Sequence, residues 1–183
     1  MPTRIDGLTR QPTRRLSSAR TPGTPSRRPV RRKISGTGRG IRILTSARMP
    51  AERDPGREVL VSGSLVALRS SEPDFDNVEA VDIDFSEHTA SRGVQRGHSV
   101  ITHPGGEKTF IVYEGTSRTI APAGGGIRTT FEGDWWYTGG TGKFTGIIGG
   151  GTYSGRVTPS GPDYSYEGEY VLGEPRSRAM WSA

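Results

Sequence analysis

The chain has 183 residues and a hydrophobic content of 31%, so it is long enough for one ordinary domain while part of it is expected to lie outside a core. It contains no cysteine, which excludes disulfides, thiolate nucleophiles and cysteine-ligated metals. No window approaches the roughly 18 consecutive apolar residues of a membrane span, and the first forty residues lack the apolar segment of a secretory signal. The sequence therefore predicts a cytoplasmic protein without a membrane partner.

The net charge of +6 averages two oppositely charged parts of the chain. Residues 1–48 contain twelve arginines and Lys33 against the single acid Asp6, and the rest of the chain is net acidic. The same stretch is rich in Ser, Thr, Pro and Gly and has no aromatic residue, so it offers little apolar surface to bury. We expect a disordered arginine-rich tail over 1–55, a folded domain over 56–175 and a short C-terminal tail over 176–183.

Three interpretations of the basic tail remain open. It could bind nucleic acid non-specifically through phosphate contacts, provided that it is part of the protein. It could be an organellar transit peptide, although its prolines would break an amphipathic helix. It could also lie upstream of a true translation start at Met49, where the composition changes sign.

From Glu58 onward, apolar and polar residues alternate with the period of half-buried β-strands. Gly- and Pro-rich turns separate the strand candidates at hairpin spacing. The candidates are 59–68, 78–85, 94–103, 109–116, 127–137, 144–157 (bent or divided at its three glycines, 149–151) and 164–172. The pattern predicts an all-β fold, a small antiparallel β-barrel of about eight strands, because glycines within strands suit the sharp bends of such a barrel.

The segment Gly139–Phe144 resembles a phosphate-binding loop only superficially. That loop requires a glycine at the position of Tyr137 and a Ser or Thr at the position of Phe144. The segment also lies between strand candidates rather than before a helix. We therefore expect a turn here, and we expect neither a nucleotide nor another cofactor.

Residues 135–155, which read WWYTGGTGKFTGIIGGGTYSG, resemble the late strand-turn-strand signature of the dirigent and allene oxide cyclase barrel superfamily. The resemblance implies an eight-stranded barrel, often a homo-oligomer, with an apolar cavity for a small lipophilic or phenolic molecule. Members of the superfamily range from cyclases of reactive intermediates to proteins that steer coupling reactions. The matching part is a turn signature, so it assigns no catalytic residue.

The acids between Asp74 and Asp84 lack the calcium-loop pattern. Asp82 and Asp84 alternate with Val81, Ile83 and Phe85, so we expect the two aspartates on a solvated outer face.

Glu79 shares the parity of the apolar residues and would enter a cavity with them. The candidate catalytic residues are Glu79, His98 and Tyr113, and the candidate ligand-binding residues are Trp135, Tyr137 and Tyr153. The three histidines lack metal-ligand spacing, so no metal site is expected, and we expect solvated or loop histidines instead. Trp135 and Trp136 should point to opposite faces of their strand.

The sequence thus leaves two functions open. One is a β-barrel that binds a small apolar ligand, with or without the activity of a cofactor-independent cyclase or isomerase. The other is a non-catalytic structural or interaction barrel. The volume and the lining of the barrel interior distinguish them, because a structural barrel is filled by its own side chains.

Overall fold

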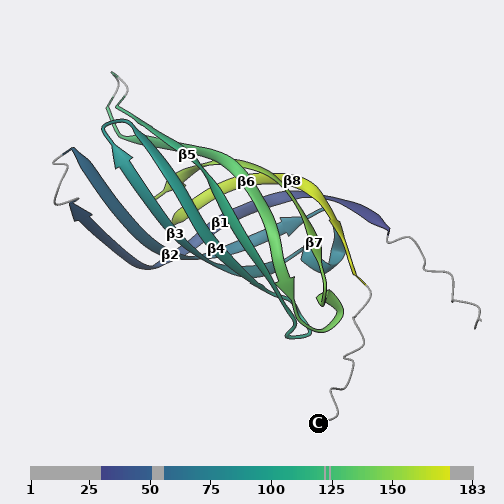
Figure 1. The fold of residues 1–183 in the computed structure, drawn as a ribbon. Coiled ribbons are helices and arrows are strands. Elements are labelled where there is room, and N and C mark those ends of the chain that lie inside the picture. The colour runs from purple at the N-terminus through teal and green to yellow at the C-terminus, as the bar shows by residue number, and fades with distance from the viewer. Residues whose placement is uncertain (1–29, 51–55, 122, 124, 174–183) are drawn as a thin grey trace, which may run out of the picture.

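The computed structural model describes residues 30–50, 56–121, 123 and 125–173, and it confirms the all-β prediction (Figure 1). Eight antiparallel strands form a closed barrel in which each strand pairs with its neighbours in sequence and β8 pairs with β1. The strands are β1 (Arg31–Pro50), β2 (Arg57–Ser70), β3 (Val78–Thr89), β4 (Arg92–Thr102), β5 (Lys108–Ile120), β6 (Arg128–Gly140), β7 (Ile148–Thr158) and β8 (Gly161–Val171), and two short 3-10 helices are η1 (Pro73–Phe75) and η2 (Gly142–Phe144).

Strand β1 lies within the segment that the composition assigned to a disordered tail, so the predicted domain boundary at residue 56 is wrong. β1 pairs with β2 over most of its length and with β8 from Arg31 to Arg39, and its Ile34 is buried. Its inward positions include Gly36, Gly38 and Gly40, and its charged residues are exposed, which explains why its composition resembles that of a disordered segment.

A chain that began at Met49 would lack β1 and would leave β2 and β8 with unpaired edges. Residues 1–29 and 174–183 are outside the described part of the chain. The nucleic-acid and transit-peptide interpretations of residues 1–29, and the predicted C-terminal tail, therefore remain predictions.

The remaining strands agree with the sequence pattern except around residue 144. The segment predicted as one strand over 144–157 is divided, because Gly142–Phe144 forms η2 and β7 begins at Ile148. The Gly139–Phe144 segment is a turn, as expected, and Gly142 adopts a φ of 56° that favours glycine.

The register of the strands makes the barrel narrow. The row of paired residues that begins at Arg57 of β2 crosses β3 to β8 and then β1 in turn. It returns to β2 at Ala67, ten residues further along. Eight strands with such a stagger enclose an interior that side chains either fill or shape around one small ligand.

Large rings inside this narrow barrel lie opposite glycines. An inward-facing aromatic residue is the cross-strand neighbour of a glycine in each of six pairs: Tyr113–Gly97, Phe131–Gly155, Trp135–Gly151, Tyr153–Gly133, Tyr164–Gly38 and Tyr166–Gly36. If Gly38 carried a Cβ, the three atoms nearest to it would all belong to the Tyr164 ring and would overlap with it. The glycines therefore provide the space in which the rings lie.

Helices η1 and η2 close one end of the barrel with an aromatic plug, defined as Phe75, Phe144 and His103. The ring centroids of Phe75 and Phe144 lie 5.4 Å apart, and His103 stacks on Phe144 at 4.1 Å. His103 is buried and contacts the Asp74 carbonyl oxygen through Nδ1 and Thr109 Oγ1 through Nε2, so it is a core residue and not the solvated or loop histidine expected from the sequence. Lys143 Nζ donates to Asp74 Oδ1 at 2.5 Å and links the two helices.

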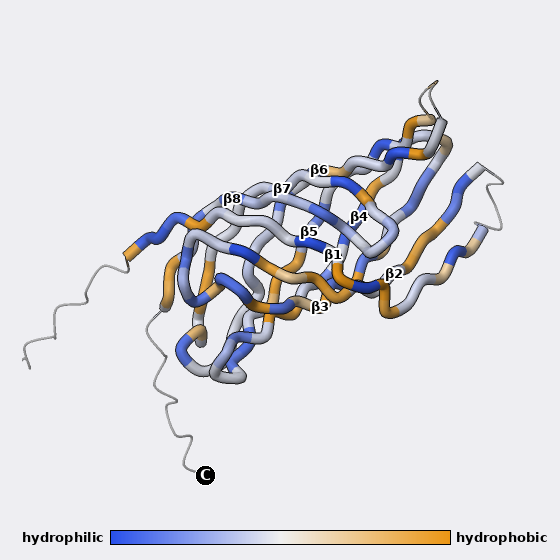
Figure 2. Tube along the Cα trace, turned by 180° about the vertical axis from the view of Figure 1, so that it is seen from behind, coloured by the Kyte–Doolittle hydropathy of each residue, from blue (hydrophilic) through white to orange (hydrophobic). Residues whose placement is uncertain are grey.

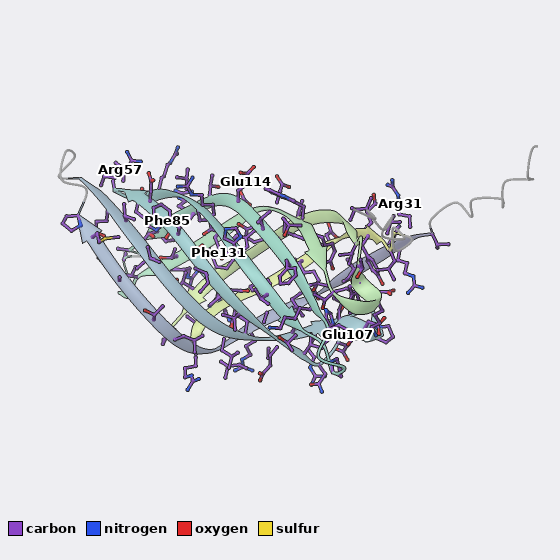
Figure 3. All side chains as sticks on the ribbon, turned by 60° about the horizontal axis from the view of Figure 1, so that its bottom comes forward. Arg31, Arg57, Phe85, Glu107, Glu114 and Phe131 are labelled. Carbon is purple, nitrogen blue, oxygen red and sulfur yellow. The ribbon has the colours of Figure 1, made fainter. Side chains whose placement is uncertain are left out.

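The opposite end of the barrel is open. The β7–β8 hairpin ends at Thr158 and Gly161, and β8 pairs with β1 no further than Arg39. The β1–β2 and β5–β6 hairpins extend beyond the end of the β7–β8 hairpin (Figure 1). Arg31 and Arg57 mark the closed and open ends (Figure 3).

The outer wall is apolar on one side and polar on the other. Leu65, Val81, Val100 and Phe110 form one outward-facing row across β2–β5, and Ile83, His98, Val112 and Trp136 form the next across β3–β6. We call these two rows the apolar outer face. Figure 2 shows stronger apolar colouring along β2 and β3 than along β7 and β8. None of the helices in the described residues is long and apolar enough to cross a membrane.

The ring-over-glycine arrangement predicts that Gly38→Ala destabilises the barrel by about 1 to 3 kcal/mol through overpacking against Tyr164. The double variant Gly38→Ala/Tyr164→Ala should lose less stability than the sum of the two single variants, because the clash disappears with the ring. Urea unfolding measures the stability of the two single variants and the double variant. Thr37→Ala, at the neighbouring exposed position, is the control and should change stability by less than about 0.5 kcal/mol. Strict additivity of the two substitutions would contradict the arrangement.

Candidate functional site

All eight strands contribute side chains to an interior cavity of about 470 Å³. It begins at the aromatic plug and runs toward the open end. Its volume is within the range of small-molecule sites in proteins. Its lining divides into an apolar floor, an acidic middle and a mixed mouth.

The floor of the cavity is apolar. Phe75 of the plug contributes to it, and the other residues of the floor are buried or partly buried aliphatic and aromatic side chains: Ile34, Leu68, Ile101, Ile111, Trp135 and Tyr137. Trp135 is only 6% exposed, and its indole N–H donates to the Thr152 carbonyl oxygen at 3.1 Å. The indole N–H of the floor is therefore already paired when an apolar group packs against it.

Two aspartates of β3 form the middle of the cavity. Asp82 is buried and accepts a hydrogen bond of 2.5 Å from Ser99 Oγ. The Tyr164 hydroxyl lies 3.4 Å from its other oxygen, and the Tyr113 hydroxyl lies 3.5 Å from Asp84 Oδ1. These contacts come from neutral hydroxyl groups, and the longer two are weak.

Burial raises the pKa of Asp82 to about 6, although hydrogen bonds from Ser99 and Tyr164 oppose this shift. Burial likewise raises the pKa of Asp84 to about 6, against hydrogen bonds from Ser86 and Tyr113. Both carboxyls can thus exchange a proton near neutral pH, which ordinary surface aspartates cannot.

Tyrosines enclose the two carboxyls. The rings of Tyr113 and Tyr153 make an edge contact at 5.7 Å, and Gln95 Nε2 donates to the Tyr153 hydroxyl at 2.8 Å. Burial raises the pKa of Tyr153 to about 12, and it raises the pKa values of Tyr113 and Tyr164 well above the ordinary value. These phenols therefore remain neutral hydrogen-bond donors at physiological pH.

The mouth of the cavity contains charged groups that offset each other. Arg48 forms an ion pair with Glu58 at 3.3 Å. His88 lines the mouth beside them, and burial lowers its pKa. Ser117, also in the lining, has a buried hydroxyl without a hydrogen-bond partner among the described residues. Such an orphan hydroxyl offers a contact to a bound molecule or a water.

The structure places four of the six predicted site residues in the lining of the cavity. Tyr113, Trp135, Tyr137 and Tyr153 line the cavity, and Trp136 faces outward, as the alternation predicts.

Glu79 and His98 are exposed on the outer wall, so the hypothesis that either enters the cavity is wrong. The expectation of an outer location for Asp82 and Asp84 is also wrong. The errors for Glu79 and for the two aspartates have one physical cause: the apolar face of β3 was taken as the inner face, whereas Val81 and Ile83 are exposed.

Sequence reasoning missed Asp82, Asp84 and Tyr164 as cavity residues. A signal was present in the neighbouring strand, where Ser62 and Ser64 share the parity of Val66 and Leu68. Away from the apolar floor, the inner face of this barrel is thus marked by serine, glycine and tyrosine rather than by aliphatic residues.

No group of three or more His, Asp or Glu side chains in the described part of the chain converges as a metal site would require. Comparison of the chain with protein-family models, with curated proteins and with solved structures gives no match.

The raised pKa of Asp82 predicts the sign of a pH effect on stability. The native state binds more protons than the unfolded state between about pH 4 and pH 6, so this residue lowers the stability of the fold as pH rises through that window. Asp82→Asn removes the effect. The free energy of unfolding of this variant, relative to that of the wild type, should rise by about 2 to 3 kcal/mol between pH 4 and pH 7.

Urea unfolding of both proteins at several pH values measures this difference. Glu79→Gln, on the outer face of the same strand, is the matched control and should follow the wild type. A difference between Asp82→Asn and the wild type that stays constant from pH 4 to pH 7 would show that the carboxyl is not buried as described.

Proposed function

We propose that the barrel binds a small, partly apolar molecule in its interior cavity. The observation that carries this proposal is the cavity of about 470 Å³, whose apolar floor and acidic middle give it two distinct ends. A structural barrel would fill this space with its own side chains. The orphan hydroxyl of Ser117 and the resemblance to the dirigent and allene oxide cyclase superfamily both support ligand binding.

The two carboxyls favour a second candidate function, a cofactor-independent cyclase or isomerase. A carboxyl with a pKa near 6 can donate a proton to a substrate in a water-poor cavity and take it back afterwards. In this proposal Asp82 or Asp84 is the general acid and Tyr113 orients the substrate. Turnover that persists in Asp82→Asn/Asp84→Asn would exclude the acid role.

The cavity can be tested with a neutral fluorescent probe, N-phenyl-1-naphthylamine. Ser62 projects into the cavity, and Val61 is the adjacent outward-facing position on β2. We expect probe fluorescence to rise with the wild type and with Val61→Phe, whereas Ser62→Phe, which fills the cavity, should weaken binding by about tenfold or more.

Both variants must be folded for this comparison, and cooperative thermal unfolding shows that they are. Equal binding by the two variants would place the probe on the outer wall. A wild type without any probe binding would favour the alternative, a non-catalytic structural barrel.

We also propose that the apolar outer face packs against a second copy of the chain. Ile83, at the β3 end of its second row, is 44% exposed, and exposed apolar rows of this kind are typical of protein contacts. Ile83→Glu should raise the dissociation constant of the oligomer by about tenfold or more, because it places a charge in the contact. Light scattering over a concentration series measures this. Thr152→Glu on the polar side is the control, and a wild type that is monomeric at all concentrations would contradict the proposal.

A further inference from the structure

Inside the mouth of the cavity, all charged side chains of the lining are acidic. Asp82 and Asp84 are the two charged side chains in the middle of the cavity, and the floor below them is uncharged. At the mouth, Arg48 and Glu58 are paired with each other, and the lowered pKa of His88 favours its neutral form. Within the described lining, the two aspartates thus have no cationic partner.

The protein leaves part of each carboxyl free. Asp82 accepts a short hydrogen bond from Ser99 and a weak one from Tyr164, and Asp84 accepts hydrogen bonds from Ser86 and, at 3.5 Å, from Tyr113. Each carboxylate can accept several hydrogen bonds. The unfilled positions face the cavity, where a ligand with N–H donors could occupy them.

Aromatic rings surround the same place. Tyr113 and Tyr153 form one wall, Phe131 extends it with its ring centroid 6.0 Å from that of Tyr153, and Tyr164 reaches Asp82 from β8. The faces of aromatic rings attract cations, and the attraction is stronger where water is excluded. Carboxylates and rings therefore favour the same kind of ligand group.

We propose that the cavity selects a ligand that carries a protonated amine on an apolar body, with the ammonium group between Asp82 and Asp84 and the body on the apolar floor. This inference rests on the proposed ligand-binding function and specifies the chemical class of the ligand. It also disfavours a ligand with a free carboxylate, because that group would approach two acids in a medium of low dielectric constant.

The arginines of the outer wall do not reverse this selection. Six exposed arginines line a second, open hollow together with the acids Glu87, Glu132 and Asp163; the arginines are Arg39, Arg57, Arg92, Arg118, Arg128 and Arg156. Their charges act through water and salt, which screen interactions beyond about 8 Å. The aspartates act at contact distance within the cavity, so they determine which ligand is retained.

Three probes with one skeleton test the selection: 4-phenylbutylamine, 4-phenylbutanol and 4-phenylbutanoic acid. Binding to the full chain is followed by NMR at the indole N–H signals, where Trp135 in the cavity floor reports binding and Trp136 on the outer wall is the internal control. The chain has three tryptophans, so Trp136→Phe assigns the control signal and Trp181→Phe assigns the third, which leaves the signal of Trp135. We expect the amine to bind about tenfold or more tightly than the alcohol, and the acid more weakly than both.

The variant Asp82→Asn/Asp84→Asn keeps the shape of the cavity and removes its charge. It should bind the alcohol as the wild type does and lose the preference for the amine. A preference that persists in this variant, or binding of the acid as tight as that of the amine, would overturn the inference. If only the alcohol shifts the Trp135 signal, the inference fails and the ligand-binding function stands. If no probe shifts it, both fail.

Discussion

The close contact between inward-facing rings and the glycines opposite them is the constraint on which this barrel depends. Eight strands with a stagger of ten residues leave little room inside, so a phenol ring can lie flat only where the neighbouring strand has no Cβ. Gly97 accommodates Tyr113, and Gly38 accommodates Tyr164. The two tyrosines in turn reach Asp84 and Asp82, so the position of the glycines sets the geometry of the acidic middle.

This arrangement also explains the inverted pattern of the strands. Rings, serines and carboxyls occupy the middle of the interior, and many aliphatic residues of β3 and β4 therefore face outward, where Val81, Ile83 and Val94 are exposed. The hydrophobic core is concentrated near the plugged end, around Phe75 and Phe144. A barrel built in this way gains its stability at one end and keeps space for a ligand toward the other.

The sequence predicted the fold better than the site, and for a physical reason. Alternation, turn residues and glycines within strands sufficed for seven of the eight strands, since these signals depend only on the local chain. β1 was missed because it combines inward-facing glycines with exposed arginines, a composition shared with disordered segments. The aspartates were misplaced because alternation gives two faces without telling which one is inner, and the usual rule of apolar inside fails for β3.

The acidic middle connects the two proposed roles of the cavity. A protonated Asp82 is a general acid, whereas an ionised Asp82 beside an ammonium group is an anchor, and one carboxyl cannot be both at the same moment. β3 supplies two carboxyls, two residues apart on the same face, with different contacts to the protein. Asp82 is the more buried and has the short bond from Ser99, and Asp84 is the more accessible from the cavity. An ammonium group midway between the two carboxyls favours the ionised form of both, whereas one that pairs mainly with Asp84 would leave Asp82 able to transfer a proton.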